Sequence, residues 1–210
     1  MIINNEARLY ELFPQLVVAA SINREFTAEE LSFAEECSKE TKVNTYNLRS
    51  ENSAVLEDAR MADIKTFVLH NINLYMKNII LPRENVDLYV TQSWFNYSGA
   101  NCAHHKHFHA NSILSGVLYI KAIDGEDKIK FHKEDKSQIA IPTYAPTRFN
   151  SEMCDIDVET GTLLIFNSNM THSVEQIRSD REDTRVSLSF NTFAKGVLGS
   201  EDVLTLLELK

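Results

Sequence analysis

Cysteine and long apolar runs are scarce in this chain, and each scarcity excludes a class of protein. The three cysteines, Cys37, Cys102 and Cys154, are scattered and odd in number, which argues against a disulfide-stapled domain and a paired-cysteine zinc finger. No apolar run approaches the roughly 18 residues of a membrane span, so we expect no membrane association. The first residues lack the basic start of a signal peptide, which favours a reduced, cytoplasmic location.

Basic residues are in the minority. Lys and Arg number 21 against 30 Asp and Glu, which gives a net charge of −9 at pH 7. General binding to nucleic acid needs clustered basic side chains, so we expect none. The 210 residues are enough for one domain with a sizeable core. We expect a mainly helical support over residues 1–85, a β-rich core over 86–195 and a C-terminal tail over 196–210.

The N-terminal part is expected to be mostly helical. Residues 27–30, Thr-Ala-Glu-Glu, form a capping box that starts one helix. Apolar residues repeat at helical spacing over 55–80, and Leu81-Pro82 ends this longer helix. Residues 16–20 have the composition of a short strand, whereas the polar stretch 38–53 is typical of a loop.

From residue 86 the periodicity changes to that of β-strands. The expected strands are 87–97, 115–122, 128–132, 162–166 and 185–191, with a short apolar piece at 138–141. Many short strands separated by turn signals predict a sandwich or barrel, so the element order indicates an α+β protein. The last strand alternates, and its polar face carries Arg185 and Ser187. Facing inward, Arg185 would need an acidic partner.

Four of the seven histidines fall between positions 104 and 109. On an extended backbone His105, His107 and His109 share one side, and His104 points away. His172, far along the chain, can join two of them to complete one face of a metal ion. Iron that activates oxygen needs such a three-sided cage with open positions.

Four stretches carry a resemblance to a known family. Residues 101–120, NCAHHKHFHANSILSGVLYI, resemble the core motif of the iron(II)/2-oxoglutarate-dependent oxygenase superfamily. They are most similar to small oxygenases of bacteria and tailed phages with an H-x-H-P-x-S-x-L-S-G-V-Y-Y-V signature. Residues 92–96, 161–172 and 185–191 resemble that family's Q-S-W-x-N, G-x-L-x-x-F-P-S-x-x-x-H and R-x-S-x-S-F-N. The resemblance implies a double-stranded β-helix, or jelly roll, with N-terminal helices packed on one sheet.

The resemblance also implies an activity. The chain would be a 2-oxoglutarate-dependent non-haem iron dioxygenase that hydroxylates an unidentified substrate and releases succinate and CO₂. Its cofactors would be Fe(II), 2-oxoglutarate as co-substrate, and O₂. The metal ligands would be His107, His109 and His172. The location would be the cytoplasm of a bacterium or of a phage-infected host cell.

The co-substrate would meet a second group of residues. Arg185, 13 residues after His172, would hold the far carboxylate of 2-oxoglutarate. The other residues expected to bind it are Ser187, Asn101 and Tyr119. The primary substrate is a small molecule or a protein, and we allow for a homodimer.

Two points stay open at the level of sequence. Most of the superfamily has Asp or Glu where this chain has His109, and the ligand pair could instead be His105 with His107. A cupin-like three-histidine dioxygenase and a non-catalytic metal-binding barrel are the alternative functions. The Arg185-Val-Ser187 motif favours the 2-oxoglutarate-dependent enzyme.

Overall fold

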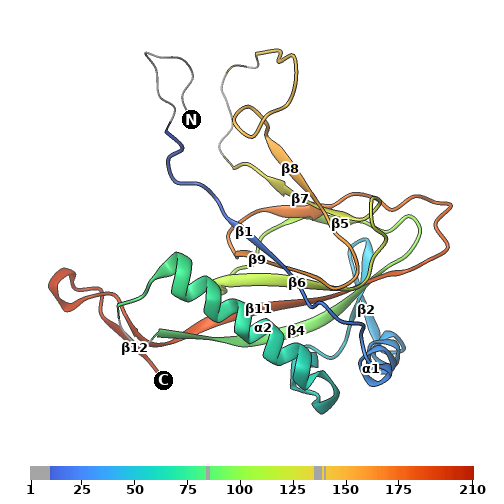
Figure 1. The fold of residues 1–210 in the computed structure, drawn as a ribbon, viewed down its shortest axis with the longest axis horizontal. Coiled ribbons are helices and arrows are strands. Elements are labelled where there is room, and N and C mark those ends of the chain that lie inside the picture. Colours follow the sequence, from blue (N-terminus) through green and yellow to red (C-terminus); the bar gives the residue numbers. More distant parts are fainter. Residues whose placement is uncertain (1–9, 84–85, 135–138, 140) are drawn as a thin grey trace.

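The fold consists of two antiparallel sheets that pack together, with helices on the outer face of the larger one (Figure 1). The computed structural model describes residues 10–83, 86–134, 139 and 141–210. No helix in these ranges has the length and apolar character needed to cross a membrane.

The larger sheet has eight strands, which are β1 (Val17–Ser21), β2 (Thr41–Asn44), β3 (Asn47–Ser50), β4 (Val86–Ser98), β6 (Leu114–Lys121), β9 (Thr162–Asn167), β11 (Arg185–Leu198) and β12 (Leu207–Leu209). Their order is β1-β9-β6-β11-β4-β3-β2, and β12 pairs with β11. The smaller sheet contains β5 (His104–His107), β7 (Lys128–His132), β8 (Met153–Asp157) and β10 (His172–Val174), in the order β5-β10-β7-β8.

The helices cover the outer face of the larger sheet (Figure 1). They are α1 (Ala28–Ser38), η1 (Val55–Glu57), η2 (Ala59–Met61), α2 (Ala62–Tyr75) and the π-helical η3 (Met76–Ile80). The short helix η4 (Glu201–Val203) near the C-terminus has no buried residues and lies outside this layer. The predicted capping box is confirmed, because the Glu30 amide donates to Thr27 and the Thr27 amide donates to Glu30. The Tyr97 hydroxyl donates to the Ala34 carbonyl at 2.6 Å and ties α1 to β4.

Two cores lie on opposite faces of the larger sheet. Seven of the eight residues of β6 are buried, because its odd and even positions point into different cores. Leu118 packs with the helices, whereas Val117 and Tyr119 pack between the sheets with Phe131 and Phe166. The predicted α+β class with helices on one sheet is confirmed.

One expectation about the flanks was wrong. Residues 41–50 form the hairpin β2–β3 rather than a loop, and β3 extends the larger sheet beside β4. Its side chains are mostly polar, so no apolar alternation marked it. The short strand expected at 16–20 is present as β1. In the C-terminal segment 196–210, β11 continues to Leu198 and its end pairs with β12.

Other elements agree with the sequence, with small changes. The helix expected over 55–80 is divided into η1, η2, α2 and η3, and it ends at Leu81 in a left-handed conformation with φ 52°. The five expected strands all occur, with β11 extended at its C-terminal end. In the apolar piece expected at 138–141, Gln138 and Ala140 lie outside the described residues.

Gly116 in β6 provides a test of this packing. A Cβ atom there would lie 2.3 Å from the Phe190 ring and 2.7 Å from the Leu164 carbonyl oxygen. Gly116→Ala should therefore destabilise the fold by about 1–3 kcal/mol, as overpacked cores typically do. Gly99→Ala is the matched control, since its Cβ would meet nothing closer than the Thr184 hydroxyl at 3.7 Å. Urea unfolding measures both, and equal midpoints would contradict the packing.

Candidate metal centre

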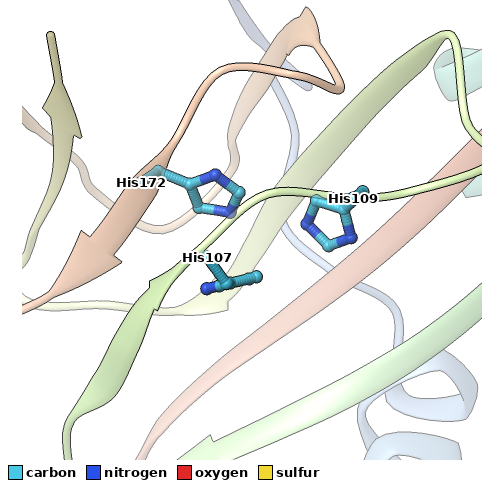
Figure 2. A group of neighbouring side chains, drawn as sticks. All are labelled: His107, His109 and His172. Atoms are coloured by element: carbon cyan, nitrogen blue, oxygen red, sulfur yellow. The ribbon is translucent and has the colours of Figure 1, made fainter. Parts of the chain in front are cut away.

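Three histidines from two distant segments of the chain converge between the two sheets. The antiparallel pairing of β10 with β5 places His172 opposite His107. His109 follows β5, and its backbone N–H donates to the Ser168 carbonyl at 2.9 Å. One ring nitrogen of each histidine lies within 4.8 Å of those of the other two. Figure 2 shows the three rings grouped around a common space, so the donors can share one ion.

Backbone carbonyls orient two of these rings. Nδ1 of His107 lies 2.7 Å from the His105 carbonyl oxygen, and Nδ1 of His172 lies 3.0 Å from that of Met170. Each Nδ1 therefore carries the proton and donates, which leaves Nε2 as the free lone pair. Metal-binding histidines in proteins are commonly fixed in this way. The donor set fits a borderline transition metal such as iron.

Burial keeps these imidazoles neutral. It lowers the pKa of His172 to about 3, with smaller contributions from His107 and His109. Burial likewise lowers the pKa of His109 to about 4, and it lowers the pKa of His107. A metal needs the unprotonated ring, so the site offers its ligands in the required state.

The neighbouring histidines lie differently from the expectation. His104 lines the same cavity and stacks on His107, with ring centroids 4.3 Å apart. His105 is exposed and outside the ligand cluster. The cause is a bulge: three steps along β5 oppose two along β10, so His104 and His107 reach the same side. The geometry therefore groups His109, rather than His105, with His107.

Arg185 begins β11 and is buried, with 5% of its surface exposed. Its Nη1 lies 3.5 Å from Oδ1 of Asp127. Arg181 binds the same carboxylate more tightly, at 2.7 and 2.9 Å. Burial by itself raises the pKa of Asp127. The hydrogen bonds from Arg181 and the Ile123 amide, together with the charge of Arg185, outweigh burial, so the pKa of Asp127 lies below its usual value. Two guanidinium groups thus share one carboxylate, and within the described part of the chain Arg185 has no carboxylate to itself.

The histidines and Arg185 line one space, which we call the central cavity. Its other polar lining residues are Asn47, Asn96, Ser98, Tyr119, Ser187 and Ser189. The inward polar face predicted for residues 185–191 therefore exists.

Of the remaining residues expected at the co-substrate, two lie in the cavity and one does not. Ser187 and Tyr119 are both buried there. Asn101 lies in an exposed turn with φ 63°, outside the cavity lining. Sequence reasoning missed Asp127 and Arg181, whose pairing spans 54 residues and leaves no local pattern. It also missed Asn47, which comes from the unexpected hairpin.

One family model matches the core of the chain. Residues 92–191 match the family model described as "Putative 2OG-Fe(II) oxygenase", where 2OG is 2-oxoglutarate. This range contains the three clustered histidines and Arg185. No curated protein matches the sequence.

Solved structures show the same fold. An oxidoreductase of the 2OG-Fe(II) oxygenase family from Burkholderia pseudomallei has a TM-score of 0.53 at 12% identity, over 84% of this chain and 83% of that one. HygX from Streptomyces hygroscopicus, with nickel and 2-oxoglutarate bound, has 0.56 at 11%, over 85% and 82%. The epimerase SnoN, in complex with Fe³⁺, alpha ketoglutarate and nogalamycin RO, has 0.62 at 13%, over 85% and 79%. The predicted jelly roll is confirmed.

The lowered pKa values predict how the metal-free protein responds to acid. Unfolded histidine takes up a proton near 6.5, whereas His172 in the folded chain does so only near 3. Between these values the unfolded state binds more protons, so stability should fall as the pH falls. His172→Gln removes one such group and should flatten the slope. Denaturant unfolding at several pH values measures this, with the exposed His70→Gln as control. An unchanged slope in His172→Gln would contradict the neutral buried ring.

Proposed function

We propose that this chain is a 2OG-Fe(II) oxygenase, because residues 92–191 match that family's model, and that it hydroxylates an organic substrate with iron held by His107, His109 and His172. The family uses Fe(II), 2-oxoglutarate and O₂. Arg185 binds the far carboxylate of 2-oxoglutarate in this proposal, with Ser187 and Tyr119 beside it. Succinate and CO₂ are the co-products.

The observation that carries the proposal is that the histidine cluster and the incompletely paired Arg185 line one cavity. A 2-oxoglutarate dianion carries a negatively charged group for each end of the cavity, the metal end and the Arg185 end. Its oxo-acid end can chelate an ion at the histidines, and its far carboxylate can neutralise the remaining charge of the Arg181–Asp127–Arg185 group. A planar guanidinium suits a carboxylate because it can donate two parallel hydrogen bonds.

Some residues of the site orient the metal-binding rings, and others pack around them and exclude water. The Nδ1–H donors of His107 and His172 fix the rings so that Nε2 faces the cavity. Phe166 packs edge-on against the His172 ring at 4.9 Å, and Trp94 lies 6.0 Å from His109, so apolar surface surrounds the ligands. Bound iron, with 2-oxoglutarate and O₂, supplies the oxidising power.

His109 makes the site unusual in its charge. Three neutral imidazoles give the metal one negative charge fewer than two histidines and a carboxylate. His109→Asp would restore the common ligand set, and it should still bind iron. The cupin-like and non-catalytic alternatives also accept three histidines, and the Arg185-Val-Ser187 motif favours the 2-oxoglutarate-dependent enzyme over them.

We propose the cytoplasm as the place of action, where iron and 2-oxoglutarate are available to a protein whose three cysteines are free thiols. The substrate is a small molecule or a protein in this proposal, without general nucleic-acid or membrane binding. A homodimer is compatible with it.

Replacing the ligands tests the metal site. His109→Ala should weaken iron binding by more than the 10- to 100-fold that changes beside a ligand typically cause. His105→Ala is the matched control, because His105 neighbours the site but is exposed and outside the cluster. Metal analysis after equilibrium dialysis gives both affinities. If His105→Ala loses iron and His109→Ala keeps it, the ligand pair is His105 with His107.

Replacing Arg185 tests the co-substrate site. Arg185→Ala should weaken 2-oxoglutarate binding by roughly 10- to 150-fold, the value of a charged hydrogen-bonded contact. Arg185→Lys keeps the charge but loses the planar fork, so its loss should be smaller. Arg178→Ala removes an exposed arginine of the same loop region and serves as control. Calorimetry on the metal-loaded protein gives the affinities, and unchanged binding in Arg185→Ala would favour the cupin-like alternative.

A further inference from the structure

Two asparagine side chains in the central cavity are buried without full hydrogen bonding. Asn47, the first residue of β3, is 3% exposed, and neither its Nδ2 nor its Oδ1 has a partner among the described residues. Asn96 on β4 is 4% exposed; its Nδ2 donates to the Ser189 hydroxyl at 2.9 Å, but its Oδ1 is likewise unpaired in the described part of the chain. Both line the cavity that holds the histidines.

Such unpaired groups are rare in proteins because each costs about 1–3 kcal/mol. Keeping two unpaired amides in one cavity does not stabilise the unliganded fold. Asparagine is also a weak strand former, so β3 does not need it for pairing. The amides therefore fit a ligand that completes their hydrogen bonds.

The co-substrate cannot donate the hydrogen bonds that the two asparagine carbonyl oxygens lack. Ionised 2-oxoglutarate has only acceptor atoms, and a carbonyl oxygen needs a donor. Whichever way the Asn47 amide is turned, it offers one acceptor and one NH₂ donor next to each other. Its partner must therefore present an N–H or O–H donor beside an acceptor.

The charge of the cavity narrows the ligand further. Arg185 is the one formally charged side chain among the described residues that line it, and the co-substrate carboxylate takes that charge. No further charged side chain among the described lining residues could balance an ionised group of the substrate. The indole of Trp94, also in the lining, offers a flat apolar wall.

We propose that Asn47, assisted by Asn96, binds a neutral amide edge of the primary substrate, in which N–H and C=O point the same way, as in a lactam or a primary carboxamide. This assignment rests on the proposed function, since it names the substrate class of that site. Asn47 pairs with both atoms of the edge, and Asn96 Oδ1 accepts a further donor. The trans amide of a peptide backbone points its N–H and C=O in opposite directions and cannot pair in this way.

Small probes test the amide edge. 2-Pyrrolidinone has the required edge, N-methyl-2-pyrrolidinone lacks the N–H, and N-methylacetamide is a trans amide. Thermal unfolding is measured with each probe at about 50 mM, with and without Fe(II) and 2-oxoglutarate under anaerobic conditions. A Kd of about 10 mM for 2-pyrrolidinone should raise Tm by about 2–4 °C, and the other two should raise it less. Equal shifts from all three probes would overturn the proposal.

Two variants separate recognition from structure. Asn47→Leu should abolish the 2-pyrrolidinone shift without lowering Tm, because the Asn47 amide has no hydrogen bond to lose within the described chain. Asn71→Leu on α2 is the matched control: it should keep the shift but lower Tm, since Asn71 Nδ2 donates to the Phe67 carbonyl at 2.9 Å. A retained shift, or a marked loss of stability, in Asn47→Leu would overturn the proposal.

Failure of the proposed function would look different. It would appear as absent 2-oxoglutarate binding in the wild-type protein, whereas the probe comparison remains readable in the metal-free protein.

Discussion

The antiparallel register between β5 and β10 is the constraint on which the site depends. It places His172 opposite His107, and the bulge in β5 turns His104 to the same side. A slip of one residue would turn these side chains to the other face of the sheet. The register is held from outside the pair, because the His109 amide is bonded to Ser168 and β10 also pairs with β7. Ligands distant in the sequence are thereby brought together before any metal binds.

The cavity has too little negative charge, and this favours the binding of an acidic ligand. Its histidines are kept neutral by burial, and Arg185 shares with Arg181 the one carboxylate that it contacts among the described residues. Burying a guanidinium without a full partner costs several kcal/mol, so the fold carries a strain that an acidic ligand relieves. A dianion that reaches both the metal and Arg185 relieves it at the correct place. The unpaired amides of Asn47 and Asn96 extend the same reasoning to a neutral part of the substrate.

Elements that depend on local pattern were predictable from the sequence. Alternation located β7 and β11 and the inward face of Arg185, and the capping box located the start of α1. Pattern could not locate the hairpin β2–β3, since its side chains are mostly polar and Thr45 makes the turn with an unfavoured φ of 58°. It misplaced His104 and His105, because a bulge depends on the partner strand. The Asp127–Arg181 pair depends on tertiary contact alone.

The central claim is that three histidines and Arg185 together hold iron and 2-oxoglutarate. Anaerobic titration of the Fe(II)-loaded protein with 2-oxoglutarate, monitored by visible absorption, tests it most directly. We predict a weak charge-transfer band that saturates at one equivalent, because the oxo-acid chelates the metal. A band that never forms, in protein shown to carry one equivalent of iron, would contradict the account.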